Sequence, residues 1–505
     1  MIGGYSRRAF LGGALSAVAG AALAEAPAVS PRPLDRPEDL LGGAAPRFAG
    51  AALPTTEELV ARARLGGQVG FAVADARTGV VLEASGADLA LPPASVAKAV
   101  TALYALTTLG ADFRFRTRLV ATGPVKNGTV QGDLVLVGSG DPMLDTDALA
   151  AMVVQLKAAG VRAVSGGFKV FAGALPYLAA IDPDQPDHVG YNPAVSGINF
   201  NFNRVHFEWK RAGTGWAVAM DARSSTLRPA VTVATIAVAE RDLPTYTYRA
   251  AGGADAWTVA SKALVSDGSR WLPVRRPDLY AGEVAQVLAA AQGIRLPRAQ
   301  AVWAMPAGGT VLVNHESASL SAIVKLMLKY STNLTAEVIG LTASAKRGAP
   351  AGNLRASAQV MCDWAQERFG TGRLHFVDHS GLGGASEATA ADMVRILVKV
   401  GADGVLHRHM KEIAPRDAAG KAAATAGYTI YAKTGSLNFV SALAGYVGAA
   451  DGTPLAFAIF TGDTARRAAI AREDMERPDG AKAWAGRSRV LQYQLLNRWA
   501  GLYGS

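Results

Sequence analysis

Hydrophobic residues recur at helical spacing directly after Ser95, with Val96, Val100, Leu103 and Leu106 as the repeating positions. Few charges fall on any side of this stretch, and a helix that is apolar nearly all round is usually buried. The pattern therefore predicts a helix that runs through the core of a domain.

A different pattern begins near residue 115, where short alternating runs are separated by turn residues. The first of these runs predict a hairpin, because Asn127-Gly128 is a strong signal for a two-residue turn between strands. Residues 196–250 alternate in the same way. This region therefore predicts a β-rich section that extends to about residue 300.

After residue 300 the pattern becomes helical again and ends in alternating strands. Two apolar helices are interrupted by the polar triplet STN, and three strands near the C-terminus are separated by short turns, which predicts an antiparallel sheet. The sequence thus predicts an α/β (α+β) domain, an antiparallel sheet flanked by helices, built from residues 27–115 and 301–505. Residues 116–300 are expected to form a β-rich insertion of one or two small domains.

Residues 1–26 have the features of an export signal peptide. The paired Arg7 and Arg8 precede an apolar stretch of roughly 15 residues, shorter than the ~20 that a membrane span needs, and small-residue sites suited to cleavage follow. This pattern predicts a twin-arginine signal, a mature chain that begins near Glu25 or Pro27, and a periplasmic or otherwise extracytoplasmic location. No later stretch is long and apolar enough to predict a transmembrane segment.

Composition limits the classes of function that are expected. The net charge of the 505 residues is +10, but the basic residues are scattered among acidic ones. Aromatic interleaving and zinc-ligand spacing are missing, so nucleic acid is not an expected partner. The single cysteine, Cys362, cannot form an internal disulfide, and no cluster of cysteine and histidine suggests a metal site. No cofactor is therefore expected.

Three short polar motifs follow one another along the chain. They are Ser95 and Lys98 in SVAK, Ser331 and Asn333 in STN, and Lys433, Thr434 and Gly435 in KTG. Each motif alone has a structural explanation, because serine is a common N-cap and both STN and KTG suit ordinary turns. Their occurrence in this order, at a helix start, an interhelical turn and a strand, favours a catalytic site.

The chemistry of these residue types supports a nucleophilic serine. A spacing of three residues places Lys98 one helical turn from Ser95, and a serine hydroxyl needs an adjacent base to become nucleophilic. Lys98 can act as that base only when it is neutral, which requires burial or a nearby cation such as Lys433. The strand that carries Lys433 offers main-chain groups to an extended peptide, and Thr434 and Ser436 offer hydroxyls to a terminal carboxylate.

The order and spacing of the motifs resemble the penicillin-binding protein 4 type of D-alanyl-D-alanine carboxypeptidase/endopeptidase, peptidase family S13. This family inserts domains between the first two motifs, which here lie 236 residues apart, from 95 to 331. The resemblance implies the serine β-lactamase/penicillin-binding-protein-like transpeptidase fold. It also implies hydrolysis of peptidoglycan stem peptides through an acyl-enzyme on Ser95, with Lys98 as the base and β-lactam antibiotics as covalent inhibitors.

The resemblance further implies roles for the later motifs and shows two departures. Ser331 and Asn333 would complete the proton network, and Lys433 with Thr434 would bind the carboxylate of the terminal D-alanine. The second motif reads STN, where SDN or SNN is commoner in the family. Gly384 stands in place of a family arginine that helps to bind the acidic end of the stem's diamino acid.

The insert is expected to line the opposite side of that pocket. Tyr191, together with Asp184 or Asp187, is the candidate for this substrate-binding role. Two other functions stay open on the sequence: a β-lactamase or esterase of the same fold, and a non-catalytic cell-wall-binding protein. The preference between carboxypeptidase and endopeptidase action is open as well, and so is the oligomeric state.

Overall fold

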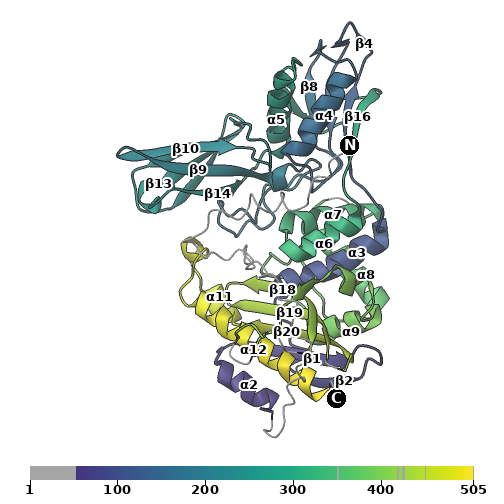
Figure 1. Ribbon diagram of the computed structural model, residues 1–505, viewed down its shortest axis with the longest axis vertical. Helices are drawn as coiled ribbons and strands as arrows, with labels where there is room; N and C mark the ends of the chain where they lie inside the picture. Colours follow the sequence, from purple (N-terminus) through teal and green to yellow (C-terminus); the bar gives the residue numbers. More distant parts are fainter. Residues whose placement is uncertain (1–52, 350–351, 418–419, 424–426, 450, 504–505) are drawn as a thin grey trace, which may run out of the picture.

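A six-stranded antiparallel sheet forms the centre of one domain (Figure 1). The computed structural model describes residues 53–349, 352–417, 420–423, 427–449 and 451–503, so the predicted export signal at residues 1–26 lies outside the described part. The strand order is β17-β18-β19-β20-β1-β2. The strands are β1 (Gln68–Asp75), β2 (Val81–Ser85), β17 (Lys411–Ile413), β18 (Thr429–Leu437), β19 (Val440–Gly448) and β20 (Pro454–Gly462).

Helices cover both faces of this sheet. One face packs on α2 (Thr56–Ala63) and α12 (Ala481–Leu502). The other face packs on a helical layer made of α3 (Ala97–Leu109), α6 (Leu320–Tyr330), α7 (Asn333–Lys346), α8 (Leu354–Phe369), α9 (Ala390–Val400) and α10 (Val405–His409). Every residue from Ala97 to Leu106 is buried, which confirms the predicted core helix. Strands from the first and last parts of the chain therefore share one sheet.

The inserted region contains a second sheet, with the order β15-β8-β6-β3-β16. Its strands are β3 (Arg116–Ala121), β6 (Leu134–Val137), β8 (Phe168–Phe171), β15 (Ala299–Val302) and β16 (Thr310–Glu316), and its helices are α4 (Thr146–Ala158) and α5 (Pro277–Ala291). The boundary predicted at residue 300 falls inside this sheet, because β15 and β16 pair with strands much earlier in the chain. The insert thus extends to Glu316.

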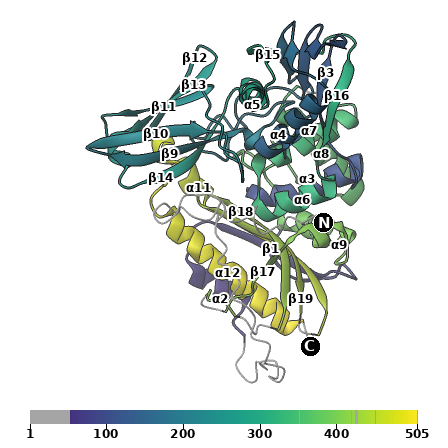
Figure 2. The ribbon, with the colours of Figure 1, turned by 45° about the horizontal axis from the view of Figure 1, so that its top comes forward.

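Smaller sheets complete the insert. The predicted hairpin at Asn127-Gly128 is confirmed, because β4 (Val125–Lys126) pairs with β5 (Thr129–Val130) and both turn residues have positive φ. β5 also pairs with β7 (Ala163–Val164). Two further three-stranded sheets project away from the helical layer (Figures 1 and 2). They contain β9 (Arg204–Ala212), β10 (Gly215–Asp221) and β14 (Gly268–Pro273), and β11 (Ala234–Ala239), β12 (Tyr246–Ala251) and β13 (Ala254–Ala260).

The segment 463–480, which includes α11 (Thr464–Ala468), joins β20 to α12 and contacts the insert; we call it the arm (Figure 2). Glu476 of the arm accepts a hydrogen bond from Arg270 of β14 at 2.8 Å and lies 2.6 Å from the ring of His188. Burial opposes ionisation of Glu476, but the contact with His188 and the charge of Arg270 outweigh it and hold the pKa at about 2. The arm is therefore fastened to the insert by a charged contact that is largely shielded from water.

Candidate active site

Ser95 lies in a short 3-10 turn, Ala94–Val96, that leads into α3. The turn begins with a left-handed residue, Ala94, at φ 45°. Val96 is the N-cap of α3 and makes no side-chain capping bond, so Ser95 is not the helix cap that its position could suggest. Its half-exposed hydroxyl instead contacts the side chain of Lys98. The hydroxyl of Ser95 is thus held by Lys98 and does not cap the helix.

Lys98 is fully buried and its ammonium has three acceptors. The Nζ atom donates to Ser95 Oγ at 2.9 Å, to Asn333 Oδ1 at 2.7 Å and to the carbonyl oxygen of Ser380 at 2.7 Å. A neutral lysine has two N–H donors and one lone pair. The amide oxygen of Asn333 and the carbonyl oxygen of Ser380 can only accept, so they take the two N–H donors of neutral Lys98 and leave its lone pair facing Ser95 Oγ.

Burial lowers the pKa of Lys98 and so favours its neutral form. It lowers the pKa of Lys98 to about 8, although the nearby carboxyl groups of Glu337 and Asp378 oppose this shift. Burial likewise raises the pKa of Glu337 to about 8. The sequence left burial or a neighbouring cation open as the cause, and the structure identifies burial as the cause that lowers the pKa of Lys98.

The STN triplet joins α6 to α7 and faces both lysines. Ser331 ends α6 in a left-handed conformation, and its hydroxyl accepts a hydrogen bond from Lys433 Nζ at 2.9 Å. Asn333 is the first residue of α7, where its Oδ1 meets Lys98 and its Nδ2 donates to the carbonyl oxygen of Tyr191 at 2.9 Å. The structure thus brings the first two motifs together across 236 residues of sequence.

The KTG motif lies on β18, beside the 3-10 turn. A methyl group on Gly435 would meet the carbonyl oxygen of Pro93 at 2.5 Å and the Ser95 nitrogen at 3.1 Å, so only glycine allows this close approach. The neighbouring strand β17 pairs only with residues 430–432. The edge of β18 from Lys433 to Leu437 therefore has no partner strand within the described residues, while Thr434 and Ser436 expose their side chains.

The loop 378–384 forms the floor behind Lys98. Asp378 is buried and accepts hydrogen bonds from the backbone N–H groups of Ser380, Gly381 and Gly383. These bonds hold the loop in place, and with it the carbonyl oxygen of Ser380 that accepts a hydrogen bond from Lys98 Nζ. His379, which burial keeps neutral by lowering its pKa to about 3, packs against α7 and α8.

Sequence reasoning missed the buried acids behind the motifs. Glu337 lies four residues after Asn333 on α7, and its Oε2 accepts from the His379 N–H at 2.9 Å. Its Oε1 has no hydrogen-bond partner among the described residues. The spacing of four, which places both side chains on one face of the helix, is the signal that could have identified Glu337.

Of the predicted residues of the insert, Tyr191 contacts the motifs, through its carbonyl oxygen. The Tyr191 hydroxyl donates to Gln185 at 3.1 Å, so its backbone rather than its ring reaches Asn333. Asp184 and Asp187 are exposed, and the Asp187 carboxylate lies 3.9 Å from Arg472 of the arm. The buried acid of this segment is Asp182, which caps its own loop through Asp184 N and Gln185.

Comparisons with known proteins place this geometry in a family. The model of the D-Ala-D-Ala carboxypeptidase 3 (S13) family matches residues 54–479. The chain belongs to this family. The predicted family, the mixed α/β fold with extra β domains and the serine-type D-Ala-D-Ala carboxypeptidase class are thereby confirmed.

Relatives of this S13 family member extend along most of its length. The D-alanyl-D-alanine carboxypeptidase of Actinomadura sp. (strain R39) is 28% identical over 466 residues, covering 83% of this chain and 84% of the relative. The carboxypeptidase DacB of Haemophilus influenzae is 24% identical over 424 residues, covering 78% and 85%. The crystal structure of penicillin binding protein 4 from H. influenzae matches with a TM-score of 0.70 at 20% identity, covering 87% of this chain and 99% of that one, which supports the fold.

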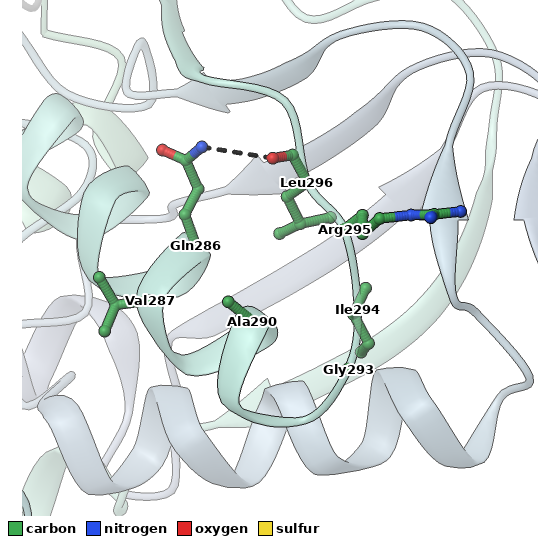
Figure 3. A pocket seen from close by; sticks show the side chains of 7 residues that line it. All are labelled: Gln286, Val287, Ala290, Gly293, Ile294, Arg295 and Leu296. Carbon is green, nitrogen blue, oxygen red and sulfur yellow. Dashed lines mark hydrogen bonds between the residues drawn. The ribbon is translucent and has the colours of Figure 1, made fainter.

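Other features of the described chain offer no competing centre. No group of three or more metal-ligating side chains occurs among the described residues, and none of their helices has the length and hydrophobicity needed to cross a membrane. A hollow at the end of α5 is lined by Gln286, Val287, Ala290 and residues 293–296, and Gln286 donates to the Leu296 carbonyl within it (Figure 3). Its lining carries no nucleophile.

Proposed function

We propose that Ser95 is acylated by peptides that end in D-alanyl-D-alanine, with Lys98 as the base. The observation that carries the assignment is the buried Lys98 Nζ, which joins Ser95 Oγ to Asn333 Oδ1 and to the Ser380 carbonyl. A lysine held in this way is neutral over a substantial fraction of the population near its pKa of about 8. The substrate class follows from membership of the S13 family.

Acylation begins when Ser95 Oγ gives its proton to the Nζ lone pair of Lys98 and bonds to the carbonyl carbon of the penultimate D-alanine. The first N–H groups of a helical turn have no partner within the helix, so the Ser95 N–H is available to the oxygen that becomes negative. The C–N bond then breaks and the terminal D-alanine leaves as an amine. Water later hydrolyses the ester and restores the serine.

The leaving amine must receive a proton. Ser331 is suited to deliver it, because its hydroxyl accepts a hydrogen bond from Lys433 Nζ, which can replace the proton that the serine gives up. Burial, together with the charges of Lys98 and Lys411, lowers the pKa of Lys433 well below its usual value. Lys433 can therefore exchange protons with the network, and in its charged form it attracts the terminal carboxylate.

The free edge of β18 is suited to bind the peptide as an added strand. The exposed hydroxyls of Thr434 and Ser436 lie where the terminal carboxylate would arrive, and Gly435 keeps this edge against Ser95. Tyr191 contributes by fixing Asn333 through its carbonyl group. Contact of Asp187 with the substrate stays a prediction.

The test combines a fluorescent penicillin with a peptide that ends in D-alanyl-D-alanine. Stable labelling with release of D-alanine is expected, and the Ser95→Ala variant should lose both. Ser85→Ala, an exposed serine at the end of β2, serves as the matched control and should keep both. Rapid turnover of penicillin would point to a β-lactamase, and absence of labelling would point to a binding protein. Persistent labelling of Ser95→Ala would refute the assignment.

Peptidoglycan lies outside the cytoplasm, so this function requires export. The twin-arginine pattern at residues 6–11 is the proposed export signal. Fusing residues 1–30 to a reporter that fluoresces only after folding in the cytoplasm tests the route. Fluorescence in the periplasm is expected, and its loss after replacement of Arg7 and Arg8 by lysine distinguishes this route from the general one.

A further inference from the structure

An exposed pair of aromatic rings lies on the insert, where two of its loops meet. Tyr177 comes after β8 and is 40% exposed, and Trp303 follows β15 directly and is 51% exposed. The ring centroids lie 5.9 Å apart and the ring planes are inclined by 64°. The Tyr177 hydroxyl donates to the carbonyl oxygen of Arg275 at 2.7 Å. A methyl group on Gly173 would lie 2.5 Å from the Trp303 carbonyl oxygen, so the two loops are packed closely together. The pair is thus anchored to the insert while it stays exposed to solvent.

The sheet topology places this pair at the edge of the insert that faces the helical layer. β6, β8 and β15 are parallel neighbours, so their carboxyl ends share one edge of the sheet. The antiparallel strand β3 enters from α3 at this same edge, and β16 leaves from it towards α6. Because Trp303 follows the carboxyl end of β15, the pair lies on the side of the insert from which the chain crosses to the active site.

One segment of the insert continues from this pair to the catalytic motifs. Arg275, whose carbonyl oxygen receives the Tyr177 hydroxyl, also holds this segment through its guanidinium. The guanidinium donates to three carbonyl oxygens there, those of Ala179, Asp187 and Asn192. Within the same segment, the carbonyl oxygen of Tyr191 accepts a hydrogen bond from Asn333. A single segment, fastened by Arg275, therefore joins the aromatic pair to the proposed site of acylation.

The size and the polar neighbours of the pair indicate the class of ligand. Two large aromatic side chains, each about half exposed, offer roughly 200 Å² of surface, which is far below the ~800 Å² per partner of a stable protein interface. The indole N–H of Trp303 makes no hydrogen bond to the described residues. Arg276 binds Asp278 through Nε and Nη2, which leaves its Nη1 available to a ligand. A sugar ring matches this surface, because its C–H face packs on an aromatic ring while its hydroxyl and acetamido groups form hydrogen bonds at the margin.

We propose that Tyr177 and Trp303 bind a sugar ring of the glycan strand to which the stem peptide is attached, while the peptide lies at Ser95. This proposal rests on the proposed function, since it takes the substrate to be peptidoglycan. The enzyme breaks no bond of the glycan, so the pair adds to substrate binding and takes no part in acylation. Binding energy of this kind lowers KM and leaves kcat unchanged.

The test compares two substrates that share one peptide, which ends in D-alanyl-D-alanine: the free peptide, and the same peptide attached to a peptidoglycan tetrasaccharide. Trp303→Ala should lower kcat/KM for the sugar-linked substrate by about tenfold, the loss expected when one well-packed aromatic contact is removed. The loss should lie in KM, and the value for the free peptide should be unchanged. Tyr177→Ala should act in the same direction. Val265→Ala removes an apolar side chain that is 89% exposed elsewhere on the insert, and this control should affect neither substrate.

Labelling by fluorescent penicillin, which carries no sugar, should be unchanged in both alanine variants and shows that they are folded. Calorimetric titration with the peptide-free tetrasaccharide needs no catalysis, and binding by the unaltered chain should be lost in Trp303→Ala. An equal loss for both substrates would mean that Trp303 only supports the fold, and would overturn the proposal. Failure of the unaltered chain to prefer the sugar-linked substrate would overturn it as well. Failure to release D-alanine from the free peptide would instead overturn the proposed function, while the titration still reports whether the sugar binds.

Discussion

Replacing Gly435 by alanine tests whether the close approach of β18 to Ser95 sets the rate of acylation. The added methyl would lie 2.5 Å from the Pro93 carbonyl oxygen, whereas real contacts of a Cβ atom stay above 3.0 Å. Either β18 or the turn before α3 must therefore move by at least 0.5 Å. The backbone on both sides is held, by β19 on one side and by α3 on the other.

Overpacking of this kind costs about 1–3 kcal/mol of folding free energy. A displacement of about 1 Å between reacting groups can lower a rate by about a hundredfold, so half of that distance should cost roughly tenfold. We expect the second-order rate constant for labelling by fluorescent penicillin to fall by about tenfold in Gly435→Ala. Thermal unfolding measured in parallel separates this effect from loss of the fold.

Gly486→Ala is the matched control. This glycine lies within α12, where an added methyl meets nothing within 4 Å. Alanine is favoured over glycine inside a helix by about 1 kcal/mol, so the control should be slightly more stable and should be labelled at the unaltered rate. A folded Gly435→Ala variant that is labelled as fast as the unaltered chain would refute the reasoning about β18.

Three further predictions follow from the buried groups. The labelling rate should rise with pH through about 8, since neutral Lys98 is the proposed base. Glu337→Gln should move the midpoint of this profile to lower pH, because it removes a carboxylate that raises the pKa of Lys98; an unmoved profile would contradict this coupling. Gly340→Ala drives a methyl into the ring of His379 and should lower the free energy of unfolding by about 1–3 kcal/mol, measured by denaturant titration, so a neutral effect would show that the ring can move. Glu476→Gln should lower the Tm at pH 7. The difference in Tm between this variant and the unaltered chain should shrink as the pH falls from about 4.5 towards 2, because the stabilising charge of Glu476 is lost over this range. A difference in Tm that stays constant would rule out this charge as the cause.

The sequence predicts those parts of the protein whose local hydrophobic pattern or turn residues match their burial and conformation in the fold. The helix after Ser95 is apolar all round and is buried, and Asn127-Gly128 forms the hairpin turn that its residues favour. The three motifs could be identified because each has a short, fixed spacing and the order of the three is informative. Their distances from one another depend on the fold and only the structure supplies them.

The missed features depend on contacts between distant segments. Glu337 has the sequence character of an ordinary polar residue on a helix, and it is buried only because the loop 378–384 covers α7. The pairing of β16 with β3, almost two hundred residues upstream, likewise depends on the fold and has no local signal in the sequence.

The pairing of β1 with β20 has a consequence for the order in which the protein folds. Gln68 pairs with Gly462, which is made 394 residues later during synthesis. The insert, in contrast, is complete once Glu316 has emerged, and domains generally fold as units from the N-terminal end. The apolar helix that follows Ser95 is therefore made long before β18, β19 and β20, the strands of the sheet on which it packs. The insert can already be folded during this interval. A newly made chain thus completes the surroundings of Ser95 last, only after nearly the whole protein has left the ribosome.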